Sequence, residues 1–311
     1  MLDVKRLRIL REVVASGSFS AAAEALYLSQ SAVSQQVATL EREVGMTLLE
    51  RTRDGTKPTD AGRVLVAHAD AAIARLDEAE RELAAIAGLE GGEVRVASFP
   101  SASATLLTLA VSDFVNRHPK VRLSVAEAEP EESVPRLRAG EFDLALVFDY
   151  PGLSEPDQRD IERTPLLTES MHIALPKNHR LAECTTVNMN ELSEEVWLCG
   201  DSPSSCGAMV KRACQDAGFD PRVGFESDDY HVLQGFVAAG LGVTLLPDLA
   251  LPTLRSDIVV LPTEPAAPAR RVWAATRPVG ARAPATDALL SVLVEAGERF
   301  AAARTKLEAV A

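Results

Sequence analysis

Short, uncharged hydrogen-bonding side chains gather at the start of one predicted N-terminal helix. They are Gln30, Ser31, Ser34 and Gln35, followed on the same face by Ala38. Glutamine and serine suit hydrogen bonds to base edges and phosphates, and small residues let a helix enter a major groove. An ordinary surface helix carries more lysine and glutamate. The face therefore indicates DNA recognition.

This helix needs a core to hold it, and its opposite side supplies an apolar stripe at helical spacing. The stripe comprises Val33, Val37, Leu40 and Val44. Ser18 or Ser20 is placed to cap a short helix before it. Leu28-Ser29 breaks that first helix, and the second begins near Ser31. The pattern predicts a helix-turn-helix.

A basic turn follows the helix pair. Asp54-Gly55 is a hairpin signal, so the segment predicts a two-stranded wing. Three basic residues there could contact phosphates, namely Arg51, Arg53 and Lys57. Thr59 is placed to cap the next helix.

One long helix is predicted from Pro58 to Leu89. Apolar residues recur along it at alternating steps of four and three, which is typical of a helix–helix seam. They are Leu65, Ala69, Ala72, Leu76, Ala79, Leu83 and Ile86. We expect this seam to form a dimer; packing within the chain is the alternative.

The composition limits the possible classes of protein. The 311 residues are 47% hydrophobic and carry a formal net charge of −13, which predicts a folded chain of two or three domains. No apolar run is long enough for a membrane span, and no signal-peptide pattern begins the chain. Four cysteines without zinc spacing predict no metal, no cofactor and a reducing cytoplasm. They are Cys184, Cys199, Cys206 and Cys214.

The acidity alone argues against DNA binding, but its distribution does not. Residues 1–63 contain nine basic and eight acidic side chains, whereas the rest contains 23 basic and 37 acidic ones. The predicted DNA-binding segment is therefore close to neutral.

From Gly91-Gly92 onward, short β-branched runs alternate with helical segments, which predicts parallel sheets with helical crossovers. The expected strands are Val94–Ala97, Val121–Ala128, Leu144–Phe148, His172–Pro176, Val196–Gly200, Val223–Glu226, Gly242–Pro247, Ile258–Pro262 and Val272–Thr276. Two of them run into hydroxyl-rich turns before a helix, at residues 98–105 and 201–205. Such turns offer serine hydroxyls and a helix N-terminus to a ligand, although serines there also serve as simple caps.

The N-terminal motifs resemble those of the LysR-type transcriptional regulators over about the first 65 residues. The matching motifs are Phe19-Ser20-x-Ala22-Ala23-x-x-Leu26, Ser29-Gln30-Ser31-Ala32-Val33-Ser34-x-Gln36-Val37-x-x-Leu40-Glu41, Gly45-x-x-Leu48-Leu49-x-Arg51-Thr52 and Thr59-x-Ala61-Gly62. Ser31, Leu49 and Pro58 depart from the residues usual in that family.

The resemblance implies a winged helix-turn-helix, a long linker helix and an α/β effector domain of two Rossmann-like subdomains of periplasmic-binding-protein type. It implies that Gln30, Ser31, Ser34 and Gln35 face the groove and that Arg51 and Arg53 face the backbone. The expected partners are double-stranded DNA, further copies of the chain as a dimer or tetramer, a small-molecule effector and RNA polymerase. The expected effector-site residues are Ser98, Ser101, Pro130, Phe148, Ser202, Ser204 and Asp228.

The predicted boundaries follow this layout. They are 1–58 for the winged helix-turn-helix, 59–90 for the linker, 91–311 for the effector domain, about 91–165 with 267–300 for its first subdomain, and about 166–266 for its second.

Two other functions can be built from the residues. Cys206 and Cys214 could form a redox switch like that of the family's peroxide-sensing branch, but eight residues along one helix separate their Cα atoms by about 12 Å, beyond disulfide reach. Ser202 and His231 could serve a hydrolase as nucleophile and base. Their spacing along the chain does not fit the hydrolase group whose motif they resemble.

Overall fold

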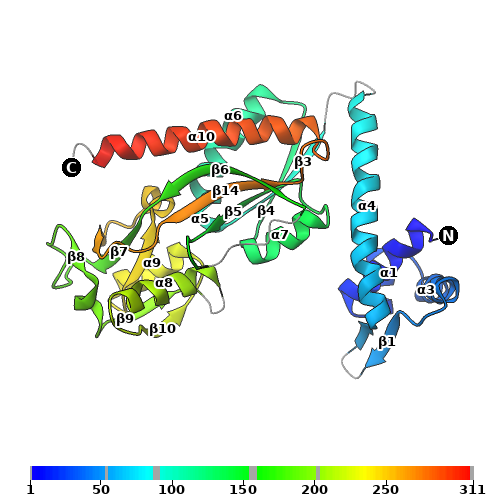
Figure 1. Cartoon of the computed structure of the whole chain (residues 1–311), viewed down its shortest axis with the longest axis horizontal. Helices are drawn as coiled ribbons and strands as arrows, with labels where there is room; N and C mark the ends of the chain where they lie inside the picture. The colour runs from blue at the N-terminus through cyan, green and yellow to red at the C-terminus, as the bar shows by residue number, and fades with distance from the viewer. Residues whose placement is uncertain (1, 53–54, 87–91, 154–159, 201–203, 309–311) are drawn as a thin grey trace. The chain divides into compact units, whose positions relative to one another are not determined.

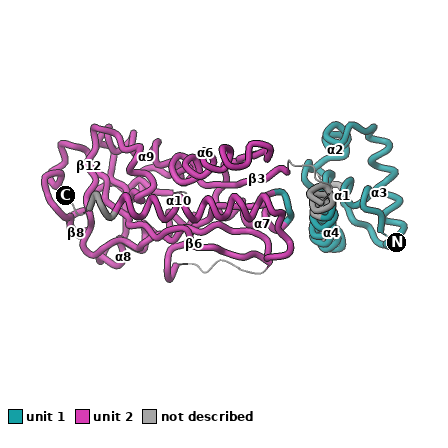
Figure 2. The backbone as a smooth tube through the Cα atoms, turned by 90° about the horizontal axis from the view of Figure 1, so that it is seen from above, with its two compact units in different colours: residues 1–87, 139–141 teal, residues 88–138, 142–311 magenta. Residues whose placement is uncertain are grey.

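The computed structural model describes residues 2–52, 55–86, 92–153, 160–200 and 204–308 (Figure 1). The chain divides into two compact units, residues 1–87 with 139–141 and residues 88–138 with 142–311 (Figure 2). No helix among the described residues has the length and apolar character needed to cross a membrane.

The first unit is a winged helix-turn-helix with a long helix attached. Its elements are α1 (Val4–Ser16), α2 (Phe19–Ala25), α3 (Gln30–Val44), β1 (Leu49–Thr52), β2 (Gly55–Pro58) and α4 (Asp60–Ile86). Caps set the helix starts. Ser18 Oγ accepts a hydrogen bond from Ala21 N, and Thr59 Oγ1 accepts one from Gly62 N.

The turn between α2 and α3 contains a backbone conformation that is rare for a large side chain. Tyr27 has a φ of 55°, in the left-handed region that favours glycine or asparagine. Its exposed fraction is 97%. The core of its domain therefore gains nothing from this ring.

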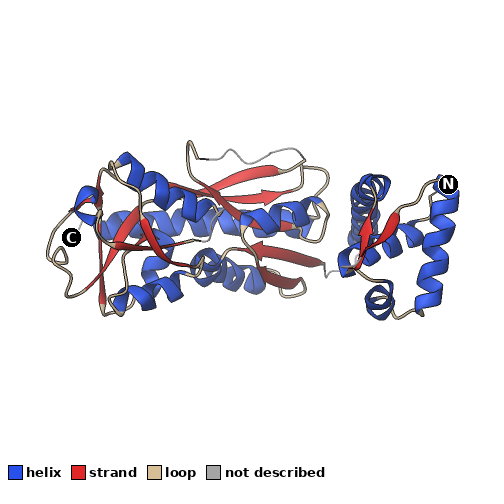
Figure 3. Cartoon of the chain, turned by 90° about the horizontal axis from the view of Figure 1, so that it is seen from below, coloured by secondary structure: helices blue, strands red, loops and turns tan. Residues whose placement is uncertain are grey.

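The second unit contains two α/β subdomains (Figure 3). The first is built on a five-stranded sheet of order β4-β3-β5-β14-β6. Its strands are β3 (Glu93–Ser98), β4 (Arg122–Glu127), β5 (Leu144–Asp149), β6 (Glu162–Glu169) and β14 (Arg270–Thr276). The sheet is mixed, because β14 runs antiparallel to both β5 and β6. The prediction of parallel sheets holds for β3, β4 and β5 and was wrong for β14.

Helices cover both faces of this sheet. One face packs against α6 (Thr108–Arg117) and α10 (Pro284–Glu308), with Val96, Leu146 and Leu293 among the buried contacts. The other face packs against α7 (Pro130–Arg138). The remaining helical turns of this subdomain are α5 (Pro100–Ala102) and η1 (Ser103–Leu107).

The second subdomain has a central antiparallel trio of order β11-β7-β12. A parallel bridge between Trp197 and Val243 joins the strand pair β10-β9 to it. Its strands are β7 (Met171–Pro176), β8 (Val187–Asn188), β9 (Val196–Cys199), β10 (Arg222–Glu226), β11 (Thr244–Pro247), β12 (Ile258–Leu261) and β13 (Thr263–Glu264). Its helices are η2 (Met189–Leu192), α8 (Ser205–Asp216), α9 (Tyr230–Ala238) and η3 (Asp248–Thr253).

The chain passes between the two subdomains along β6 and β14, which lie side by side. Strand β6 was not predicted from the sequence, and the predicted subdomain boundary at about residue 165 falls inside it. Pro165 lacks an N–H group and cannot donate a hydrogen bond to a neighbouring strand, so the sequence of this segment does not predict a strand. It is tolerated because β6 lies at the edge of the sheet.

Candidate functional site

The recognition helix α3 is held by its buried face. Val33, Val37 and Leu40 are all buried in the core of the first unit. Ser29 caps the helix, since its Oγ accepts a hydrogen bond from Ala32 N at 3.2 Å. The predicted stripe and the predicted break before α3 are both present.

The opposite face carries the predicted polar set. Gln30, Ser31 and Gln35 are exposed, and Ser34 is half-buried. Gln36 differs from them because its Oε1 accepts a hydrogen bond from Arg6 Nε. The helix thus presents short neutral donors and acceptors beside its positive N-terminal end.

The wing forms as an antiparallel hairpin in which Leu49 pairs with Pro58 and Thr52 with Gly55. Lys57 is exposed on its second strand. Arg53 lies outside the described residues, and the side chain of Arg51 is likewise not described. Pro58 ends β2 without breaking the hairpin.

The first residues of the predicted seam on α4 pack within their own domain. Ala69 is 1% exposed and belongs to the core of its own domain, and Leu65 packs against that core. Ala69 is therefore covered by its own domain, whereas Leu65 is half-buried. Ala72, Leu76 and Ala79 are exposed. The side chains of Leu83 and Ile86 lie outside the described ones.

The first hydroxyl-rich turn of the effector domain is buried. Ser98 is inaccessible to solvent, and its Oγ donates to the Phe99 carbonyl oxygen. Ser101 Oγ accepts a hydrogen bond from Arg270 Nη2 at 2.9 Å. Phe148 is buried edge-on against Phe99, with the ring centroids 4.8 Å apart.

The second turn is partly described. Ser204 caps α8, with its Oγ accepting a hydrogen bond from Gly207 N at 3.2 Å. Ser202 lies outside the described residues. Pro130 begins α7 and is half-buried.

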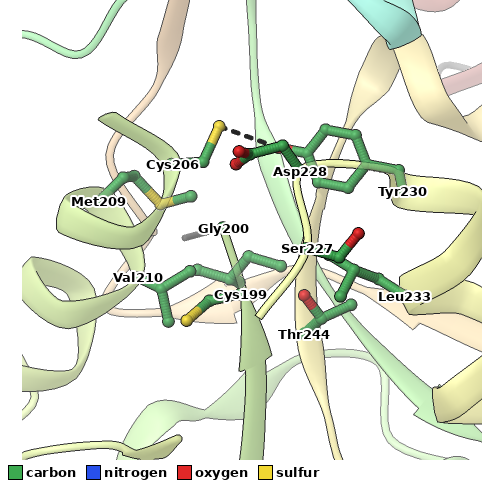
Figure 4. A pocket seen from close by; sticks show the side chains of 11 residues that line it. Cys199, Gly200, Cys206, Met209, Val210, Ser227, Asp228, Tyr230, Leu233 and Thr244 are labelled. Carbon is green, nitrogen blue, oxygen red and sulfur yellow. Dashed lines mark hydrogen bonds between the residues drawn. The ribbon is translucent and has the colours of Figure 1, made fainter. Parts of the chain in front are cut away.

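A small pocket, partly open to solvent, lies in the second subdomain (Figure 4). Asp228 is the only charged side chain among the residues that line it. The lining residues are Cys199, Gly200, Cys206, Met209, Val210, Ser227, Asp228, Tyr230, Leu233, Thr244 and Leu245. Its walls come from α8, α9 and the ends of the strands between them, so none of the predicted residues of the first subdomain lines it.

Cys206 connects this pocket to the first subdomain. Its Sγ lies 3.6 Å from the hydroxyl oxygen of Tyr150 and 3.7 Å from that of Tyr230. Burial raises the pKa of both tyrosine hydroxyls well above the usual value. The two phenols therefore stay neutral and can donate hydrogen bonds.

A buried ion pair lies next to this cluster. Arg270 Nε donates to Glu169 Oε1 at 2.6 Å, and the two side chains are 1% and 0% exposed. Glu169 Oε2 also accepts a hydrogen bond from Leu249 N of the second subdomain. The guanidinium carbon lies 4.9–5.0 Å from the ring centroids of Phe148 and Phe99, within cation–π range. The Arg270–Glu169 pair thus contacts both halves of the effector domain.

The carboxyl of Glu129 is a further titratable group of the effector domain. Burial raises the pKa of its carboxyl to about 8, the negative charge of Asp228 adds to this rise, and Arg270 opposes it. The carboxyl therefore keeps its proton more readily than an exposed glutamate does.

Profiles of known protein families match both units of the chain. The profile described as the LysR substrate binding domain matches residues 87–298, and that of the bacterial regulatory helix-turn-helix protein, lysR family, matches residues 4–63. The chain belongs to the LysR family of transcriptional regulators.

Individual relatives agree with this assignment. The probable HTH-type transcriptional regulator LrrA of Synechococcus elongatus is 31% identical over 94% of this chain and 96% of its own. The transcriptional dual regulator GltC of Bacillus subtilis is 30% identical over 79% and 81%. The LysR family regulator CbnR shares the fold, with a TM-score of 0.66 at 20% identity over 95% of this chain and 99% of its own.

As a LysR-type regulator, the protein is a DNA-binding transcription factor with an effector-binding domain, and the family is non-enzymatic. The structure offers the hydrolase hypothesis no support. His231 is exposed at the start of α9, and Ser202 is not described. Within the described residues, no group of three or more metal-ligating side chains is placed to hold a metal ion.

The redox hypothesis is also weakened. Burial raises the pKa of Cys206 to about 11 and that of Cys214 to about 12. Since the thiolate is the reactive form, both residues are poor nucleophiles near neutral pH.

The polar centre of this LysR protein's effector domain was not predicted from the sequence. Arg270, Glu169 and the two tyrosines were not singled out. A weak signal was present, because Glu169 and Arg270 are charged residues that flank apolar strand segments. Only the pairing of strands 101 residues apart reveals the ion pair.

Proposed function

We propose that this regulator reads the major groove of an operator with the exposed face of α3 and contacts the flanking phosphates with its wing. The observation that carries this proposal is the polar face formed by Gln30, Ser31, Ser34 and Gln35, fixed by a buried stripe behind it. Arg51, Arg53 and Lys57 supply the phosphate contacts.

The active form is a homo-oligomer in the cytoplasm. A dimer positions two recognition helices on two half-sites, which matches the symmetry of most operators. The exposed residues Ala72, Leu76 and Ala79 of α4 support a helix–helix contact between copies, continued by Leu83 and Ile86. Tetramers and contact with RNA polymerase follow the usual pattern of the family.

The effector domain controls this output by binding a small molecule where its two subdomains meet. A ligand that binds one arrangement of the subdomains more tightly shifts the population toward it. Ser98, Ser101, Pro130, Phe148, Ser202, Ser204 and Asp228 are the residues that we assign to this region, together with Arg270 and Glu129.

Binding to promoter DNA tests the recognition step. Footprinting on the DNA upstream of the protein's own gene identifies the operator. Gln35→Ala is expected to cost about 1–3 kcal/mol on that operator and to leave binding to random DNA unchanged. Lys57→Ala is expected to weaken binding to both and to lower the salt slope by about one.

Matched control variants carry the same types of substitution outside the DNA-binding unit. Gln215→Ala and Lys211→Ala change exposed residues on α8 of the effector domain and should change neither measurement. Equal losses on operator and random DNA for Gln35→Ala would contradict the assignment of α3.

A further inference from the structure

The C-terminal helix α10 packs on the first subdomain over only part of its length. Leu293 is fully buried there, and Gly297 lies against β6 so closely that a Cβ atom would be 2.5 Å from the Leu166 carbonyl oxygen. Phe300 still packs on the same apolar core. Residues 301–303 are exposed. The helix therefore continues beyond the region where apolar contacts hold it.

Arg304, which follows these exposed residues, contacts the second subdomain. Its Nη1 donates a hydrogen bond to Asp248 Oδ2 at the start of η3. The same nitrogen lies 3.4 Å from the carbonyl oxygen of Thr168, near the end of β6. The Arg304–Asp248 ion pair thus joins a helix of the first subdomain to an element of the second.

Asp248 has further partners in its own surroundings. Ser170 N donates to its Oδ2 at 2.7 Å, and His172 Nε2 lies 2.8 Å from its Oδ1. Burial raises the pKa of Asp248, but the hydrogen bonds of His172 and Ser170 and the charge of Arg304 together lower it. The carboxylate is therefore ionised at neutral pH, and it keeps two hydrogen-bond partners if Arg304 moves away.

The exposure of this ion pair differs from that of the Arg270–Glu169 pair. The side chains of Arg304 and Asp248 are 29% and 3% exposed, whereas those of Arg270 and Glu169 are 1% and 0% exposed. Breaking a fully buried pair leaves an uncompensated buried charge. A released Arg304 would instead be solvated, and Asp248 would keep its other donors. The Arg304–Asp248 pair is therefore much easier to open.

We propose that the Arg304–Asp248 ion pair is a releasable latch, which holds the second subdomain in one orientation against α10 and opens when the regulator changes state. This proposal rests on the proposed control of output by movement of the two subdomains. An effector that favours the released arrangement acts against this contact, so the latch sets how much of the free protein is in the held arrangement.

Hydrogen exchange of the full-length protein, without any effector, tests the latch. The amide of Leu249 donates to Glu169 of β6, so its exchange reports movement between the subdomains. The amides of β7, the central strand of the antiparallel trio, report the stability of the second subdomain itself. Arg304→Met should make exchange at Leu249 about fivefold faster and leave that of β7 unchanged.

Arg299→Met is the matched control on the same helix. Arg299 pairs with Asp113 of the first subdomain at 2.5 Å, so its loss should leave exchange at Leu249 unchanged. Arg304→Lys keeps the charge and should retain most of the wild-type protection. Unchanged exchange at Leu249 in Arg304→Met overturns the proposal. An equal increase in β7 also overturns it, because the contact would then support the fold in general.

A reporter gene behind the operator tests the regulatory consequence. Without effector, Arg304→Met should change basal expression by about twofold or more, and Arg299→Met should not. Faster exchange at Leu249 with unchanged expression refutes the regulatory role of the latch. Failure of the wild-type protein to protect any promoter DNA refutes the proposed function instead, and the exchange measurement does not depend on DNA.

Discussion

The recognition helix and the polar centre around Arg270 expose their functional side chains to opposite degrees. Gln30, Ser31 and Gln35 lie in water on one short helix. Arg270 and Glu169 are buried, and they come from strands 101 residues apart. Exposed polar groups are solvated without any partner, whereas buried ones need partners that the fold must bring to them.

This difference in exposure determines whether a functional side chain also contributes to the stability of the fold. A polar residue on the exposed face of α3 can be replaced with little effect on folding, because water satisfies it in both states. A residue in the buried centre supports the fold as well as any ligand. Three experiments test this contrast.

The largest effect is expected from Arg270→Met. The substitution leaves the Glu169 carboxylate buried without its counter-ion, which should lower the free energy of unfolding of the effector domain by about 3–5 kcal/mol. Urea unfolding measures the change. Adding Glu169→Gln should recover much of the loss, since the amide oxygen can still accept from Leu249 N.

The matched control is Arg117→Met, which removes an exposed ion pair with Glu295 on the surface of the same domain. Water screens that pair, so its removal should have a far smaller effect. Comparable losses for the two arginine variants would contradict the contrast.

An intermediate effect is expected from Leu76→Lys on α4. Leu76 is 45% exposed, so the monomer should fold normally, but a charge in the seam should weaken dimerisation about tenfold or more. Sedimentation equilibrium measures the dissociation constant. Val279→Lys, at a 74% exposed site, should leave it unchanged. An unchanged constant for Leu76→Lys would place the dimer contact elsewhere.

The smallest effect is expected from Tyr27→Asn. Asparagine tolerates the left-handed conformation at φ 55°, so the free energy of unfolding of the first unit should rise by up to about 1 kcal/mol. Thermal melting measures it. The same change at Tyr150, where no such strain exists and the ring is buried, should destabilise the effector domain. A destabilised Tyr27→Asn would show that the exposed ring contributes to the fold after all.

The first unit could be predicted from the sequence because its signals are local. The spacing of Val33, Val37 and Leu40 defined the buried face of α3, and Thr59 marked the start of α4. Ala69, which was predicted for the seam, is buried in its own domain, because heptad spacing does not say which partner a helix covers. The first turns of α4 pack on their own domain instead.

The effector cleft could be predicted only in outline. The hydroxyl-rich turns led to Ser101, which contacts Arg270. Nothing in the local sequence shows that Arg270 faces Glu169, because that contact depends on the register between β6 and β14. The mixed sheet was missed for the same reason, since strand direction depends on the path between the subdomains.

The placement of the Arg270–Glu169 pair has a mechanical consequence. The two residues are direct neighbours across β6 and β14, the strands that connect the subdomains. The ion pair therefore fastens the two connecting strands together at one point and acts as a pivot. Because both residues belong to the five-stranded sheet of the first subdomain, movement of the second subdomain would leave the pair intact and would act on the hydrogen bond from Leu249 N to Glu169 Oε2. An effector bound near this point would act on the short arm of a lever, and small changes of angle would produce larger displacements at the far ends of the domain.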